Sequence, residues 1–85
     1  MDENRLLPNI DKIHTTKLGK ERIKNNLNLN NNVVEYLKSK IEKENCIIYK
    51  KGKNYYCEVD NIIITINSNN YCIITAHIIN RKRWL

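Results

Sequence analysis

A carboxylate and an imidazole stand in the second half of this 85-residue chain, at positions that a β-sheet would bring to one face. They belong to Glu58 and His77, and each is preceded two residues earlier by a hydroxyl group, Tyr56 or Thr75. A carboxylate and an imidazole can act as general base and general acid when RNA is cleaved through its own 2′-hydroxyl, a reaction that needs no metal ion. The sequence therefore indicates these four residues as candidate catalytic groups.

Cations and tyrosines in the same half could bind the substrate of such a reaction. Lys and Arg side chains can hold a phosphate and offset the charge that gathers on it in the transition state. Tyrosine rings offer stacking surfaces for unpaired bases. The candidate nucleic-acid-binding residues are Lys50, Lys51, Lys53, Tyr49, Tyr71, Arg81 and Arg83. A glutamate and a histidine on a half-exposed sheet face also occur as ordinary cross-strand partners, and that interpretation stays open.

The charge of the chain is positive and unevenly distributed. Fifteen Lys and Arg stand against nine Asp and Glu, for a net charge of +6, and residues 46–85 hold six basic and only two acidic residues. A basic surface favours phosphates, acidic proteins or anionic lipid. The same charge would also keep a small domain in solution without any specific partner.

The cysteines are expected to be reduced thiols. Three of them, an odd number, occur in a chain with no apparent signal peptide and no apolar run near the ~20 residues of a membrane span, which favours a cytoplasmic location. Neither histidine is spaced with them as a zinc site requires. No Gly-rich phosphate loop, nucleophile elbow or CxxC pair is present, so we expect neither a metal nor a cofactor.

The elements that must position these groups change type near residue 45. The sequence of residues 1–45 predicts three helices. The first lies within 4–13, the second begins after Thr15 or Thr16, and the third begins near Val33. Apolar residues recur at helical spacing in the second and third of these. They are Leu18, Ile23 and Leu27, and Val33, Val34, Leu37 and Ile41.

From Cys46 the apolar residues recur with a period of two, as in β-strands. Turn signals at Lys51-Gly52, Asp60-Asn61 and 68–70 divide this part into strands at 46–50, 53–59, 62–67 and 71–79. These loops place Ile48 opposite Tyr55, Cys57 opposite Ile64 and Ile63 opposite Thr75.

The alternation then assigns each side chain to a face of the sheet. The expected core face carries Cys46, Ile48, Tyr55, Cys57, Val59, Ile62, Ile64, Ile66, Cys72, Ile74, Ala76 and Ile78, so the cysteines are expected to be small buried hydrophobes. The opposite face carries Ile47, Tyr49, Asn54, Tyr56, Glu58, Ile63, Thr65, Asn67, Tyr71, Ile73, Thr75 and His77.

The predicted fold class is α+β, with about three N-terminal helices packed on one face of a C-terminal four-stranded antiparallel meander. A chain of this length supports one domain with one core, here 1–85. A basic tail at 80–85 follows the sheet, and it could track a nucleic-acid backbone or fold back over an open core edge.

Several stretches together resemble a small bacterial family classed among the domains of unknown function. They are Asn9 to Thr16, Gly19, Arg22-Ile23, Lys51 to Tyr56, and Tyr71 to His77. The resemblance covers nearly the whole chain and implies no established activity.

A helical half followed by a sheet whose last strand reads Ile-Thr-Ala-His is also similar to the barnase, EndoU, colicin and RelE-like ribonuclease superfamily, which includes many toxins. That resemblance implies acid and base roles for a last-strand histidine and a sheet glutamate, the positions matched by His77 and Glu58. The chain departs from the pattern because its basic residues lie in a hairpin turn and in the tail.

The leading hypothesis is a small basic RNA-directed protein of toxin or mobile-element type, a metal-independent endoribonuclease that uses His77. RNA is the expected partner, with an antitoxin or another protein as a further one and no membrane. Two alternatives remain open: a non-catalytic protein-binding module, such as a phage-type inhibitor of a nucleoprotein enzyme, and a structural domain that forms homodimers through its sheet.

Overall fold

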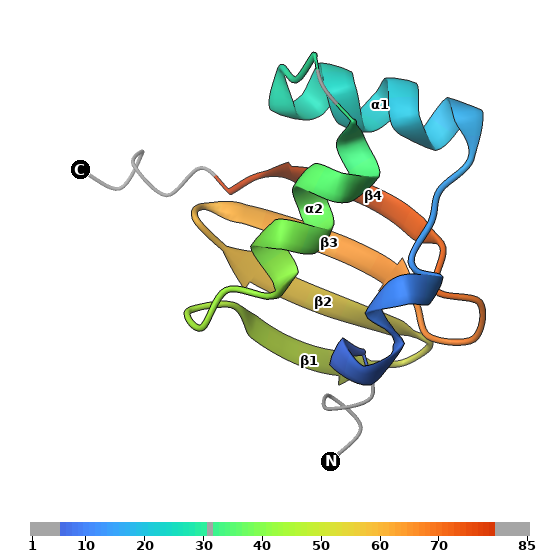
Figure 1. The fold of residues 1–85 in the computed structure, drawn as a ribbon, viewed down its shortest axis with the longest axis vertical. Helices are drawn as coiled ribbons and strands as arrows, with labels where there is room; N and C mark the ends of the chain where they lie inside the picture. The colour runs from blue at the N-terminus through green and yellow to red at the C-terminus, as the bar shows by residue number, and fades with distance from the viewer. Residues whose placement is uncertain (1–5, 31, 80–85) are drawn as a thin grey trace.

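Helices come first and a sheet second in the computed structural model, which describes residues 6–30 and 32–79 (Figure 1). In chain order the elements are the 3₁₀ helix η2 (Leu7–Lys12), α1 (Lys17–Leu27), α2 (Val33–Ile41), β1 (Ile47–Lys51), β2 (Asn54–Val59), β3 (Ile62–Asn67) and β4 (Ile73–Ile78). The four strands form one antiparallel sheet in the order β1-β2-β3-β4. The predicted α+β class and the meander are confirmed.

Both α-helices begin at side chains that cap them. Thr16 accepts a hydrogen bond from the Gly19 backbone N–H, and Asn32 accepts one from the Glu35 N–H, so each satisfies an amide that the helix leaves without a partner. Leu18, which the sequence places at helical spacing with Ile23 and Leu27, is not part of the core, because 74% of this residue is exposed. Ile23 is buried there together with Gly19.

The expected first helix is a 3₁₀ helix whose regular conformation is interrupted at Asn9. Pro8 lies in its first turn, the place where a helix tolerates proline. Residues 4 and 5, with which the prediction began, lie outside the described part of the chain.

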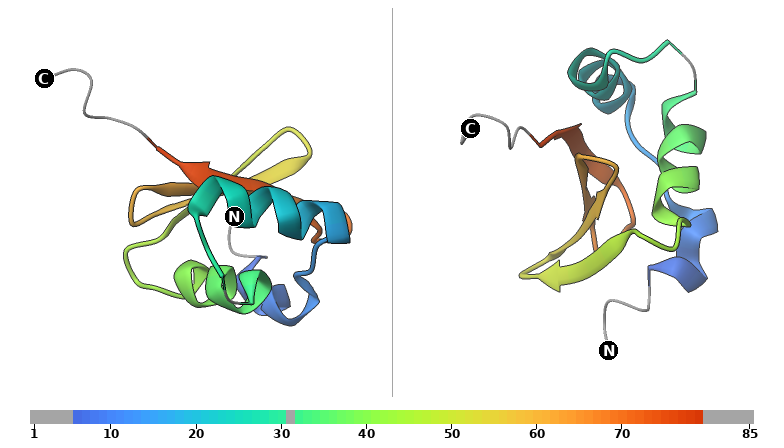
Figure 2. Two further views of the ribbon diagram at one scale, coloured as in Figure 1. Left: turned by 90° about the horizontal axis from the view of Figure 1, so that it is seen from above. Right: turned by 90° about the vertical axis from the view of Figure 1, so that its left-hand side faces the viewer.

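Within that described part, the helices cover one face of the sheet and leave the other uncovered (Figure 2). The covered face and the helices share a core in which apolar side chains are almost fully buried: Leu6, Ile13, Ile23, Val33, Leu37, Ile41, Tyr55, Cys57, Val59, Ile62, Ile64, Ile66, Ile73 and Ala76. We call the uncovered face the open face.

Hydrogen bonds join the segment between η2 and α1 to the start of β4. The His14 N–H donates to the Tyr71 carbonyl over 3.2 Å, and the Ile73 N–H donates to the His14 carbonyl over 2.7 Å. The Thr15 hydroxyl then donates to the Ile73 carbonyl over 3.0 Å. Further along β4, the Asn26 amide of α1 donates to the Ala76 carbonyl over 3.2 Å. These bonds hold the helical layer against the β4 edge of the sheet.

Gly19 allows this close approach, so we expect Gly19→Ala to destabilise the protein. Alanine normally favours a helix over glycine by up to about 1 kcal/mol. Here a Cβ atom would overlap the Thr15 hydroxyl, which must move and give up its bond to Ile73. Loss of that bond should make the net change about 1–2 kcal/mol unfavourable in urea denaturation. In a Thr15→Ala background the same substitution should be neutral or stabilising, and an equal loss in both backgrounds would refute this explanation.

The predicted register of the first hairpin is wrong by two residues along the partner strand. Ile48 lies opposite Cys57 instead of Tyr55, because the turn residues are Gly52-Lys53 and not Lys51-Gly52. Gly52 has φ +64°, a conformation that glycine adopts without strain and that suits the first position of a two-residue hairpin loop. A shift of two residues keeps every side chain on its predicted face.

The second hairpin has the predicted register, with Cys57 opposite Ile64. Its turn residues Asp60 and Asn61 both have positive φ, 50° and 66°. Asp and Asn tolerate this conformation better than most residues, which is why this dipeptide is a strong turn signal.

The third hairpin differs most from its prediction. Ile63 lies opposite His77 instead of Thr75, and an irregularity inserts Ile74 as an extra residue in β4. The loop before β4 is longer than expected, because the Asn67 side chain accepts hydrogen bonds from the Asn69 and Asn70 N–H groups. Ile73, predicted on the open face, is therefore buried, whereas Ile74 and Ile78, predicted in the core, are 41% and 55% exposed.

Candidate functional site

The observed register aligns the candidate catalytic residues in two rows across the open face. The first row runs Ile47, Glu58, Ile63, His77 from β1 to β4, and we call it the acid–base row. The second runs Tyr49, Tyr56, Thr65, Thr75, and we call it the tyrosine row. Two residues along a strand separate the rows, or about 6.8 Å. Glu58 and His77 thus share one row, and Tyr56 and Thr75 share the next.

Glu58 is held by a tyrosine of the neighbouring row. The Tyr49 hydroxyl donates to the Glu58 carboxylate over 2.8 Å. This hydrogen bond is the main reason why the pKa of Tyr49 is raised above its ordinary value. The Tyr49 ring in turn stacks on the Tyr56 ring, with centroids 5.5 Å apart and planes 23° apart. The two tyrosines therefore fix the position of the carboxylate.

A hollow lies beside this tyrosine pair. It has a volume of about 350 Å³ and is lined by Tyr49, Lys51, Gly52, Tyr56 and Ile63. Ile63 belongs to the acid–base row, whereas Gly52 belongs to the β1–β2 turn. The hollow thus extends from the hairpin turn to the residue that separates Glu58 from His77.

The other predicted binding residues are dispersed. Strand alternation places Lys51 on the open face, but Lys50 lies opposite the buried Tyr55, and Lys53 lies in the turn. Tyr71 packs against the core cluster, where the Lys12 ammonium lies 5.9 Å from the centre of its ring, so its predicted place on the open face is wrong. Arg81 and Arg83 lie outside the described residues.

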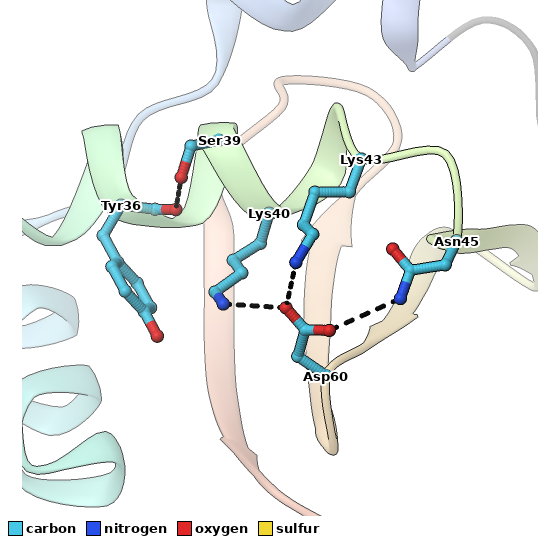
Figure 3. A network of polar contacts seen from close by, with 6 residues as sticks. All are labelled: Tyr36, Ser39, Lys40, Lys43, Asn45 and Asp60. Carbon is cyan, nitrogen blue, oxygen red and sulfur yellow. Dashed lines mark hydrogen bonds and ion pairs between the residues drawn. The ribbon is translucent and has the colours of Figure 1, made fainter.

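A second polar cluster joins the β2–β3 turn to the end of α2 (Figure 3). The Asp60 carboxylate accepts hydrogen bonds from Lys40 over 2.8 Å, from Lys43 over 2.7 Å and from the Asn45 amide over 3.4 Å. The bond from Lys40, followed by those from Lys43 and Asn45, holds the pKa of Asp60 well below its usual range. Two of the chain's lysines are therefore engaged in a structural contact.

We expect this cluster to make stability depend on acid. Because the pKa of Asp60 is lower in the folded than in the unfolded chain, its contribution is present above pH about 4 and is lost as the pH falls through the folded value. Asp60→Asn keeps a residue that tolerates positive φ and removes the charge. It should lower the thermal midpoint by a few degrees at pH 7 and low salt, and the difference should shrink below pH 4 and in high salt. A difference that is constant down to pH 2 would contradict this role.

The cysteines lie mainly on the core side. Cys57 is fully buried, Cys46 packs against the core cluster, and both are free thiols. A hydrogen bond with Cys46, together with burial, raises the pKa of Cys57 above its ordinary value, so the thiol is held in its neutral form. Among residues 6–30 and 32–79, no group of three or more His, Cys, Asp or Glu side chains is arranged to hold a metal ion.

Large apolar side chains are exposed at both edges of the sheet. Ile47 of β1 is 62% exposed, and Ile74 and Ile78 of β4 are also exposed. No helix in the described part of the chain has the length and hydropathy needed to cross a membrane.

Sequence reasoning missed three features of this surface. It did not find the Tyr49–Glu58 hydrogen bond, the hollow that ends at Ile63, or the Asp60 cluster. For the hollow, the sequence offers one signal: Ile63 is an apolar residue that the alternation places on the face away from the core. The Asp60 cluster joins segments up to 20 residues apart and leaves no local pattern.

Fold and surface together define the class of protein: a small α+β domain whose helices cover one face of an antiparallel meander, and whose other face presents a glutamate, a histidine and paired tyrosines. The chain belongs to the family described as protein of unknown function (DUF3781), whose sequence profile matches residues 7–77. This match confirms the resemblance to a family of domains of unknown function, and it includes both Glu58 and His77. No curated protein and no solved structure matches the chain.

Proposed function

We propose that this protein is a metal-independent ribonuclease that binds RNA on the open face, with Glu58 as general base and His77 as general acid. The observation that carries the proposal is the register, which aligns Glu58, Ile63 and His77 in one row. Two strand spacings separate the glutamate from the histidine, roughly 10 Å between backbones. Side chains that reach toward each other across this gap leave room for one phosphodiester.

The proposed reaction needs only these two groups and the substrate. Glu58 takes the proton of the 2′-hydroxyl, and the 2′-oxygen forms a bond to phosphorus as the bond to the 5′-oxygen breaks. The imidazolium of His77 gives its proton to the departing 5′-oxygen. The products are a 2′,3′-cyclic phosphate and a free 5′-hydroxyl. Tyr49 supports the general base by holding the Glu58 carboxylate in place through a hydrogen bond.

The experiment is incubation of the pure protein with end-labelled structured and unstructured RNA in EDTA, followed by analysis of the new ends. The proposal expects 2′,3′-cyclic phosphate ends from RNA and no cleavage of the same sequence made with 2′-O-methyl groups, which cannot supply the attacking hydroxyl. Glu58→Gln should remove most of the activity, since it deletes the base and keeps the shape. Intact RNA after prolonged incubation would refute the catalytic proposal.

A second candidate function is binding of a protein partner without catalysis. The exposed isoleucines at the two edges of the sheet favour it, because an edge strand offers unpaired backbone groups together with apolar contacts to another chain. Ile78→Lys, at an exposed edge position outside both rows, should abolish capture of such a partner and leave RNA cleavage intact if the first proposal is correct.

A further inference from the structure

We infer that the hollow beside the tyrosine pair binds one unpaired RNA base, so that the protein acts on single-stranded rather than duplex RNA. The inference deepens the proposed function and rests on it in taking RNA as the ligand. Its first support is position. The hollow begins at the β1–β2 turn and ends at Ile63, within the acid–base row.

The second support is the chemistry of the lining. The rings of Tyr49 and Tyr56 are stacked on each other, and both border the hollow together with the apolar Ile63. Flat aromatic surfaces beside aliphatic ones suit the face of a nucleobase, and such stacking accepts every base. In a duplex the base faces are already stacked on their neighbours, so only an unpaired base can enter.

The third support is charge. Lys51 borders this hollow, at the end away from Glu58, and its ammonium can hold the phosphate of the stacked nucleotide. A second hollow, beside the β2–β3 turn, is lined by residues that include Glu58 and Asp60, and none of its lining residues is a Lys or Arg. Of these two hollows, only the one beside the tyrosine pair is lined by a cation that can bind the phosphate of the stacked nucleotide.

The spacing of the rows connects the base site with the reaction. The tyrosine row lies about 6.8 Å from the acid–base row along the strands. A base stacked on Tyr56 therefore belongs to a nucleotide next to the phosphate that lies between Glu58 and His77. Tyr56 is the residue to test. Tyr49 also donates a hydrogen bond to Glu58, so replacing Tyr49 would disturb the proposed general base as well as the hollow.

The test compares Tyr56→Leu with Tyr56→Phe, which keeps the ring. The probe is a fluorescein-labelled 2′-O-methyl RNA octamer in EDTA, single-stranded or annealed to its complement, with affinity read from anisotropy. Loss of one stacked base should weaken single-strand binding about tenfold in Tyr56→Leu and leave Tyr56→Phe unchanged. Duplex binding should be weaker and equal in all three proteins. Equal affinity of Tyr56→Leu and the wild type for the single strand would overturn the inference, as would duplex binding as tight as single-strand binding.

Cleavage of unmodified RNA, followed in parallel, separates this inference from the proposed function. If the wild type does not cleave RNA but its affinity depends on the Tyr56 ring, the base site stands and the catalytic proposal fails. If the wild type cleaves RNA and Tyr56→Leu binds and cleaves as well as it does, the base site fails and the catalytic proposal stands. Absence of single-strand binding overturns the base site.

Discussion

Replacing His77 with alanine should lower the rate of RNA cleavage by about 10²- to 10⁴-fold, the contribution expected of a positioned general acid. His77 is exposed at the end of the acid–base row, and the core does not include it. The substitution should therefore leave the urea midpoint of unfolding nearly unchanged. Single-turnover cleavage of a short labelled RNA in EDTA measures the chemical step without product release.

His14→Ala is the matched control, because it removes the other imidazole of the chain. Its Nδ1 lies 2.9 Å from the Lys12 carbonyl oxygen, and the residue fastens the helical layer to β4 through its backbone. Cleavage by this variant should match the wild type. Equal rates in the wild type and the His77→Ala protein would show that any cleavage has another origin.

Replacing Ile64 with alanine should cost about 2–5 kcal/mol of the free energy of unfolding, the usual range for a large aliphatic side chain removed from a core. Ile64 is fully buried in β3, between Cys57 of β2 and Ala76 of β4. A small domain has only about 5–15 kcal/mol of stability, so the variant should lose a large share of it. Urea denaturation followed by circular dichroism measures the change.

Ile63→Ala provides the comparison from the same strand. Ile63 is only half-buried and faces away from the helices, so its loss should cost no more than about 1 kcal/mol. Similar costs at the two positions would mean that both faces of the sheet are covered, which would contradict the existence of the open face.

The assignment of side chains to faces could largely be predicted from the sequence. Alternation of apolar and polar residues put Glu58 and His77 on one face and Cys57 and Ile64 on the other, and the structure agrees. The assignment of faces was correct although the predicted register of the first hairpin was wrong. The register error was two residues, and a shift of two residues keeps each side chain on the same face. The single row of Glu58 and His77 was not predicted, since the assumed third hairpin placed Thr75 opposite Ile63.

Two local choices account for these differences. Positive φ was assigned to a dipeptide that starts at Lys51, although only Gly52 takes that conformation without strain. At the last hairpin, Asn67 and Asn70 accept backbone hydrogen bonds and lengthen the loop. Ile74 then becomes an extra residue in β4, and the alternation of apolar and polar residues does not predict such an insertion.

Contacts between distant segments could not be predicted at all. The Thr15 hydroxyl donates to the Ile73 carbonyl, 58 residues away, and the Asp60 carboxylate accepts hydrogen bonds from Lys40 of α2 and from Lys43 just after it. These bonds depend on how the helices pack on the sheet. These contacts also determine which lysines are free to bind a ligand. Lys40 and Lys43 form ion pairs with Asp60, whereas Lys51 lines the hollow on the open face.

The measurement that tests the central claim most directly is an NMR titration of protein labelled at the isoleucine methyl groups and the histidine rings with unlabelled single-stranded 2′-O-methyl RNA. Ile47 and Ile63 lie in the acid–base row, whereas Ile64 and Ile66 face the core from the same sheet, so the alternation supplies an internal control. The account expects shifts of the Ile47 and Ile63 methyl signals, together with the His77 ring, while Ile64 and Ile66 stay in place. Shifts confined to signals of the helices, or no shift at saturating RNA, would contradict it.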